Sequence, residues 1–123
     1  MVYSSGTTGA SKGIQLTNTG INAAIVECGP YTYGFKRKER YFLQIPVWFS
    51  TGIITTGLAP LRYGVSLILE PIYDFNLFDK EIAKYKPNYM ITATGLVNHM
   101  MKNPKLSNCA KYFKCLAIGG EGI

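Results

Sequence analysis

The stretch YFLQIPVWFSTGIITTGLAPLRYGVSLIL, residues Tyr41–Leu69, has the strand–helix–strand pattern that decides the expected fold. Tyr41–Val47 and Val65–Leu69 are short apolar runs typical of buried strands. The apolar spacing between them suits a helix, which Pro60 should kink or shorten because proline removes a backbone donor. Two strands joined by a helix normally run parallel, so this stretch predicts an α/β unit.

A helix is also expected upstream of this unit. Apolar residues recur at i, i+3, i+4 and i+7 from Ile21, which predicts a helix over residues 18–28. Thr17 or Asn18 is placed to cap its start, and Gly29-Pro30 is placed to end it.

The alternation continues downstream. The expected elements are a helix capped by Asn76 and stopped by Pro87, a strand over 89–93, a helix from Thr94 or Gly95 to Pro104, a polar loop, and a strand over 115–118. The pattern predicts an α/β fold, a mostly parallel sheet with alternating helices on both faces. Ligands of such sheets bind beyond the carboxyl ends of the strands, here after Val47, Leu69, Ala93 and Ile118.

Composition limits the class of protein. The chain has 123 residues, enough for one domain, and its charged fraction of 16% is low for a soluble domain, so a segment of a larger protein is expected. No apolar run is long enough to span a membrane and no secretory signal opens the chain. Three cysteines at irregular spacing favour reduced thiols in a cytoplasmic protein.

The net charge of +6 raises the question of nucleic-acid binding. Much of the excess is local, in the basic run over residues 36–40, which is interpreted as a solvated loop. The tyrosines are scattered along the chain rather than interleaved with basic residues, so nucleic acid is not expected as a partner. A basic interaction module is the third hypothesis for the function.

The chemically unusual stretch is YSSGTTGASKG, residues 3–13. Glycines let backbone N–H groups approach an anion, hydroxyls add donors, and Lys12 adds a positive charge, a composition that suits a polyphosphate. A flexible linker is the alternative, but it would need no lysine at a fixed place. The stretch matches neither G-x-x-x-x-G-K-[ST] nor G-x-G-x-x-G.

YSSGTTGASKGIQLTN resembles the phosphate-binding signature of the adenylate-forming superfamily, which includes acyl-CoA synthetases, luciferases and peptide-synthetase adenylation domains. Two later segments resemble further elements of that family in order and spacing. PVWFSTG, residues 46–52, is similar to its acyl-pocket element, and AIGGEG, residues 117–122, is similar to its adenine-side turn. The resemblance covers residues 1–123 as part of the large domain, without the small carboxyl-terminal domain.

The resemblance implies a two-step ligation. A carboxylate attacks the α-phosphate of ATP, which gives an acyl adenylate and pyrophosphate, and a thiol of coenzyme A or of a carrier then takes the acyl group. Mg²⁺ and a charged loop would stabilise the departing pyrophosphate, and Lys12 is the expected catalytic charge. Residues expected to bind the nucleotide are Ser4, Ser5, Gly6, Thr7, Thr8, Gly9, Lys12, Gly13, Gly120 and Glu121.

Trp48, Phe49 and Gly52 are expected to line the acyl pocket, although the two aromatic rings could equally belong to the core. The apolar Trp48-Phe49 pair favours a fatty acid. Phe49 stands where the family commonly has histidine, Ser11 where it has proline, and Gly122 where proline is common.

No metal ligands are assigned. His99, the only histidine, is interpreted as a surface residue. Glu121 could be a solvated turn residue. The alternative function is a non-catalytic nucleotide- or phosphate-binding module, and residues 1–123 alone are expected to be inactive.

Overall fold

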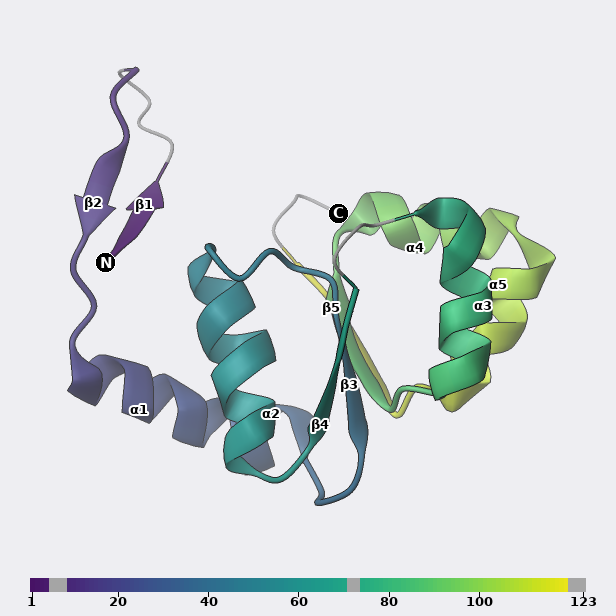
Figure 1. The fold of residues 1–123 in the computed structure, drawn as a ribbon, viewed down its shortest axis with the longest axis horizontal. Helices are drawn as coiled ribbons and strands as arrows, with labels where there is room; N and C mark the ends of the chain where they lie inside the picture. Colours follow the sequence, from purple (N-terminus) through teal and green to yellow (C-terminus); the bar gives the residue numbers. More distant parts are fainter. Residues whose placement is uncertain (5–8, 71–73, 120–123) are drawn as a thin grey trace.

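The computed structural model describes residues 1–4, 9–70 and 74–119. Its centre is a four-stranded parallel sheet in the order β4-β3-β5-β6, formed by Ser66–Leu69, Arg40–Leu43, Tyr89–Thr92 and Cys115–Ile118. A separate antiparallel hairpin, β1 (Val2–Ser4) and β2 (Lys12–Ile14), stands away from the sheet in Figure 1. The predicted α/β fold with a mostly parallel sheet is confirmed.

Helices cover both faces of the sheet. One side carries α1 (Asn18–Glu27), η2 (Thr51–Leu58) and α2 (Ala59–Arg62), and the other carries α3 (Phe75–Tyr85), α4 (Thr94–Lys102) and α5 (Pro104–Cys109) (Figure 1). Two shorter helical segments, η1 (Cys28–Tyr33) and η3 (Ala110–Tyr112), complete the elements. Among the described residues, no helix has the length and apolar character that a membrane span requires.

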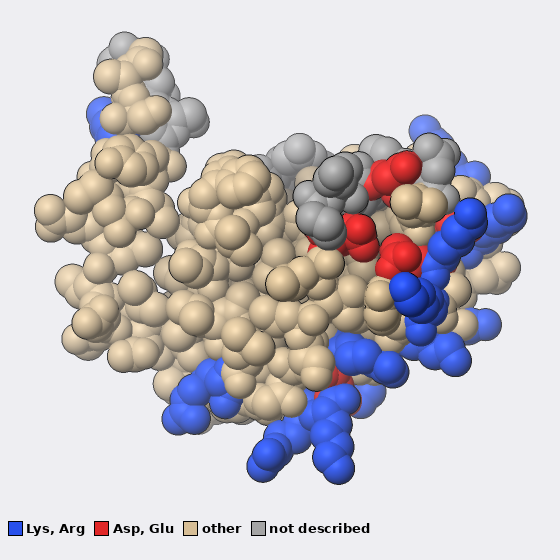
Figure 2. All heavy atoms as spheres, in the orientation of Figure 1, with Lys and Arg blue, Asp and Glu red and all other residues tan. Residues whose placement is uncertain are grey.

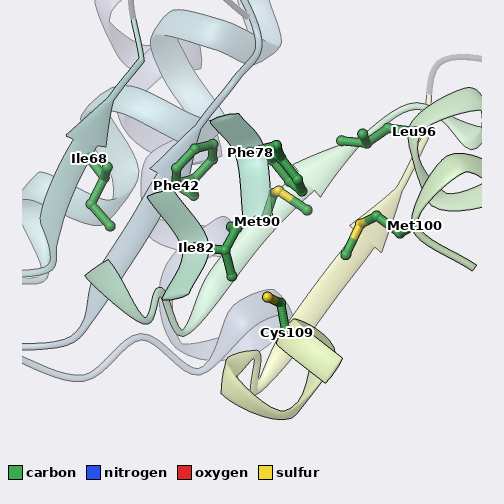
Figure 3. Packing of buried hydrophobic residues seen from close by; sticks show 8 residues of the cluster. All are labelled: Phe42, Ile68, Phe78, Ile82, Met90, Leu96, Met100 and Cys109. Atoms are coloured by element: carbon green, nitrogen blue, oxygen red, sulfur yellow. The ribbon is translucent and has the colours of Figure 1, made fainter. Parts of the chain in front are cut away.

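Each helical layer packs its own hydrophobic core against the sheet, because successive residues of a strand point to opposite faces. Phe42 and Met90 point toward α3 and α4, where the cluster drawn in Figure 3 also contains Ile68, Phe78, Ile82, Leu96, Met100 and Cys109. Tyr41 and Tyr89 point to the other face. The cluster there also contains Ile25, Phe35, Ile54, Ala59 and Val65.

The strand β3 is shorter than predicted. It ends at Leu43, whereas the sequence pattern predicted a strand through Val47. Pro46 has no N–H to donate to a neighbouring strand, and its carbonyl instead accepts from Phe49 N at 3.1 Å in a turn. Residues 44–49 therefore leave the sheet and run across its carboxyl edge.

Helix α1 begins where the sequence predicted, since the Thr17 side chain accepts from Gly20 N at 3.0 Å. The α-helix ends at Glu27, close to the predicted end at residue 28. Gly29-Pro30 does not stop helical structure, however, because the wide turns of η1 follow directly and end at Gly34, whose φ of 62° is left-handed. Gly29 is tightly packed, because a Cβ there would lie 1.9 Å from the Tyr63 ring.

Three further differences concern helix boundaries. The segment before Pro60 is helical as predicted, but its turns are wide in η2 and Pro60 lies at the start of α2. Helix α3 begins at Phe75, so Asn76 is inside it rather than at its cap. The expected loop after Pro104 contains α5, and the Asn103 side chain accepts from Lys105 N at 3.1 Å, a cap signal that the sequence analysis missed.

Candidate functional site

The site is the carboxyl edge of the sheet, where segment 44–49 crosses between the strand ends. β4, β3, β5 and β6 run parallel, so all four end on this edge. In Figure 1 this is the upper edge, near the C label and the start of α4. The sequence analysis expected a ligand at this edge, and three hollows of the structure lie there. A further hollow, of about 390 Å³, lies at the opposite edge beside Arg37 and Arg62.

Three hollows follow one another along segment 44–49. The first, about 390 Å³, lies between the ends of β3 and β4 and is lined by Leu43–Trp48, Leu69 and Glu70. The second, about 210 Å³, lies toward β5 and is lined by Gln44–Pro46, Thr92, Ala93 and Leu96. The third, about 430 Å³, lies toward the hairpin and is lined by residues 1–3, 47–49 and Ile53. Most of these walls are apolar, which suits the hydrocarbon part of a ligand.

The two aromatic residues of segment 44–49 belong to neither hydrophobic core. Trp48 is 72% exposed and Phe49 is 52% exposed, and their ring centroids are 6.3 Å apart. Both contribute walls to the third hollow. They are therefore not core residues, and their role as walls of an acyl pocket stays a prediction.

Gly52 is buried beneath this segment rather than open to a hollow. A Cβ at Gly52 would lie 2.0 Å from the Pro46 carbonyl oxygen and 3.1 Å from Val47 Cα. Thr56 donates from its hydroxyl to Gly52 O at 2.8 Å and is fully buried. The absent side chain at Gly52 thus lets η2 approach the backbone that carries Trp48 and Phe49.

The two ends of the glycine- and hydroxyl-rich stretch lie in the paired strands of the hairpin. Ser4 pairs with Lys12 and Tyr3 with Gly13 in the register of β1 and β2, so Lys12 stands directly after the loop and is exposed. Gly9 has a φ of 95°, a conformation that favours glycine, and nothing lies within 4 Å of a Cβ placed there. The open backbone at Gly9 and the exposed Lys12 side chain are donors of the kind that bind phosphate oxygens.

Several expected site residues lie outside the described part of the chain. They are Ser5, Gly6, Thr7, Thr8, Gly120 and Glu121, and of Ser4 only the backbone is described. Their contacts with a nucleotide remain predictions.

The opposite edge of the sheet carries positive charge. Figure 2 shows Lys and Arg side chains gathered at the lower side of the view, below the amino ends of the strands. Lys36–Lys38 are exposed, as predicted for a solvated loop. Basic residues also precede β4, β5 and β6, at Arg62, Lys86 and Lys114.

The carboxylate of Glu39 lies at this basic edge and accepts three hydrogen bonds. Glu39 accepts hydrogen bonds from the Tyr89 hydroxyl, from Lys114 Nζ in an ion pair, and from Lys36 N at 3.1 Å. Burial alone would raise the pKa of Glu39, but the three donors together lower it below 4.5. Burial and the neighbouring Glu39 carboxylate raise the pKa of Tyr89, which keeps the phenol protonated. This network connects the loop before β3 to β5, at the edge opposite the three hollows along segment 44–49.

Other reactive groups add no site in the residues that the structure describes. No group of three or more His, Cys, Asp or Glu there could hold a metal ion. His99 is exposed on α4, which agrees with its interpretation as a surface residue. Cys28, Cys109 and Cys115 are free thiols, and burial raises the pKa of Cys109 and Cys115.

Sequence reasoning missed two contributors to the hollows. Gln44 lines both the first and the second hollow, and Glu70 closes the first. The available signal was Pro46, because a proline inside an apparent strand predicts that the chain leaves the sheet near it. Residues just before that proline were therefore candidates for the edge rather than the core.

Comparison with known proteins identifies the family. The AMP-binding enzyme family matches the chain over residues 1–123. The chain belongs to this family. Its fold is that of part of the large domain of adenylate-forming enzymes, as the solved structures below also indicate.

Individual relatives share the fold at low sequence identity. The chain is 29% identical over 107 residues to a long-chain-fatty-acid–CoA ligase of Bacillus subtilis and 28% identical over 108 residues to 4-coumarate–CoA ligase 4 of Arabidopsis thaliana. These matches cover 86% and 85% of this chain but 19% of each relative. The ATP-bound crystal structure of MatB from Rhodopseudomonas palustris superposes with a TM-score of 0.84 at 19% identity, covering 97% of this chain and 23% of that one. The chain thus spans about a fifth of these relatives.

Proposed function

We propose that the protein containing residues 1–123 is an ATP-dependent carboxylic acid:thiol ligase. It joins a carboxylate to the α-phosphorus of ATP while the bond to pyrophosphate breaks, and then transfers the acyl group to a thiol, with coenzyme A as the expected acceptor. The observation that carries the proposal is membership of the AMP-binding enzyme family over the full length of the described fold. Coenzyme A ligases among the relatives support the same reaction class.

The hairpin would bind the phosphates of ATP, and segment 44–49 would bind the acid. Lys12, with Gly9 and the rest of loop 3–13, would hold the β- and γ-phosphates and stabilise the charge that develops as pyrophosphate leaves. The hollows beside Trp48 and Phe49 would hold the acid. Mg²⁺ would add positive charge near the phosphates, and its ligands are not assigned. The turn over residues 117–122 would lie against the adenine.

A fatty acid is the favoured substrate. The walls of the three hollows are mostly apolar, and the Trp48-Phe49 pair presents exposed aromatic surface to the third. Burial of a hydrocarbon chain against such walls contributes roughly 0.8 kcal/mol per methylene group. The relatives act on differing acids by name, so this preference rests on the hollows of this chain.

The alternative is a nucleotide- or phosphate-binding module without ligase chemistry. Its support is that the loop and Lys12 need only backbone and charge to bind phosphate. The two functions differ in acid-dependent exchange of pyrophosphate into ATP, which only the ligase carries out.

The deciding experiment is pyrophosphate exchange by the full-length parent protein and its Lys12→Ala variant. Loss of a preorganised charge costs about 2 to 4 kcal/mol of transition-state stabilisation, so exchange should slow roughly a hundredfold or more. Lys36→Ala, in the exposed loop at the opposite edge, is the matched control and should leave exchange unchanged. Exchange within threefold of wild type in Lys12→Ala would remove Lys12 from the mechanism, and no acid-dependent exchange in wild type would favour the binding module.

A further inference from the structure

Gln44 occupies the point where the hollows meet. It is the first residue after β3, and it lines both the 390 Å³ hollow toward β4 and the 210 Å³ hollow toward β5. Trp48 lines the first and third hollows, so the three lie side by side along segment 44–49. A ligand chain in the first or the second hollow lies beside Gln44.

The amide of Gln44 is an unused donor. Its Nε2 atom is buried and has no hydrogen-bond partner among residues 1–4, 9–70 and 74–119. A buried N–H without an acceptor is costly, and the few such groups in folded proteins call for an explanation. Other polar side chains at the edge, such as Thr92, do not supply the acceptor.

The surroundings of Gln44 specify the acceptor it lacks. Leu43, Ile45, Pro46 and Leu69 give the hollow apolar walls, which favour hydrocarbon. Among the described residues, Glu70 is the one acid that lines it, and its charge repels a second carboxylate or a sulfonate on the ligand. An uncharged oxygen carried on an apolar chain satisfies both conditions.

We propose that Gln44 is a specificity-determining residue whose side chain turns toward the hollows when substrate binds and donates a hydrogen bond from Nε2 to a hydroxyl or carbonyl oxygen on the acyl chain. The inference rests on the proposed ligase function and narrows its substrate class. The preferred acid is then a mostly apolar monocarboxylic acid with one neutral oxygen substituent, rather than a plain fatty acid or a dicarboxylic acid.

The expected effect follows from the unpaired donor. An acid without the oxygen leaves Nε2 buried and unpartnered, so kcat/KM for the plain acid should lie about tenfold to a hundredfold below that for the oxygenated acid of equal length. Gln44→Leu keeps nearly the same volume and removes the donor. In that variant the preference for the oxygenated acid should vanish or reverse, because the substrate oxygen is then the group that is buried without a hydrogen-bond partner.

The experiment uses the full-length parent protein and measures AMP formation with medium-chain acids of one length. The series contains the plain acid, monohydroxy and oxo acids with the oxygen at each successive carbon, and the dicarboxylic acid. Wild type, Gln44→Leu and Gln44→Met are compared, and Gln15→Leu, at an exposed glutamine after β2, is the matched control. Glu70→Gln tests rejection of the dicarboxylic acid, which this variant should relax.

A preference of at least tenfold for one oxygen position, retained in Gln15→Leu and lost in both Gln44 variants, supports the assignment. Equal rates for plain and oxygenated acids in wild type, or a preference that survives in Gln44→Leu, would overturn it while leaving the ligase function standing. AMP formation with none of the acids would overturn the proposed function and this inference together. Unchanged ATP binding in the Gln44 variants excludes general unfolding as the cause.

Discussion

Substituting Gly52 by alanine tests whether the position of Trp48 and Phe49 depends on a close backbone contact. The new methyl group would lie 2.0 Å from the Pro46 carbonyl oxygen and 2.7 Å from the Pro46 carbonyl carbon. Ordinary contact begins near 3.4 Å, so η2 and segment 44–49 must separate before the methyl group fits. Neither side can yield by a change of rotamer, because both are backbone.

The cost should fall at the upper end of the range for overpacked sites, about 3 kcal/mol of unfolding free energy. The buried hydrogen bond from Thr56 to Gly52 O holds η2 in place, which adds to the resistance. The strain should also displace the pocket aromatics. A misplacement of this kind commonly costs about a hundredfold in rate, so kcat/KM for the acid should fall roughly that much while ATP binding changes little.

Urea unfolding and acid-dependent AMP formation in the full-length parent would measure both effects. Gly95→Ala is the matched control, since nothing lies within 4 Å of a Cβ at Gly95 in the first turn of α4. It should leave stability unchanged or raise it by up to about 1 kcal/mol. A Gly52→Ala protein within roughly 0.5 kcal/mol of wild type, with unaltered acid kinetics, would refute the reasoning.

Three further outcomes are expected. Phe49→Ala should shift the chain-length preference of the acid more than the affinity for ATP, and an equal loss toward all acids together with lower stability would instead assign Phe49 to the core. Glu39→Gln should cost about 1 to 2 kcal/mol of unfolding free energy at pH 7, because three donors lower the pKa of Glu39 below 4.5. That contribution is present above pH 4.5 and is lost as the pH falls through the folded pKa, so wild type and Glu39→Gln should converge in acid; a constant difference down to about pH 2 would contradict the assignment. Residues 1–123 alone should form no AMP above a Lys12→Ala control, and acid-dependent AMP from the segment would mean that the reaction needs fewer groups than the family pattern implies.

Most of the central fold could be predicted from local patterns. The apolar runs that became β4, β5 and β6 and the helical spacing of α1 were read directly, because burial imposes a period of two or 3.6 on neighbouring residues. The errors came from prolines and from side-chain caps. Pro46 ended β3 early, Pro30 did not end the first helical segment, and Asn103-Pro104 began a helix that composition alone suggested was a loop.

The candidate site divides in the same way. The expected phosphate loop around Lys12 and the segment with Trp48 and Phe49 were proposed from the sequence, because residue type and spacing are enough to suggest their chemistry. Gln44 and Glu70 were missed, since their importance comes from the hollow that they share and not from their neighbours in the chain.

The sequence by itself determined the alternation of strands and helices and membership of the AMP-binding family, since both depend on residues close together in the chain. Only the tertiary structure decided the strand order β4-β3-β5-β6, which places residues far apart in sequence at one edge. It also decided that the Pro46 backbone occupies the space that a side chain at position 52 would need. The hydrogen bonds of Glu39 with Tyr89 and Lys114 likewise depend on the tertiary structure. The residues in these contacts are not spaced in the sequence at the period of a helix or a strand, so no local pattern predicts them. The free energy of packing and hydrogen bonding determines which of them meet when the chain folds.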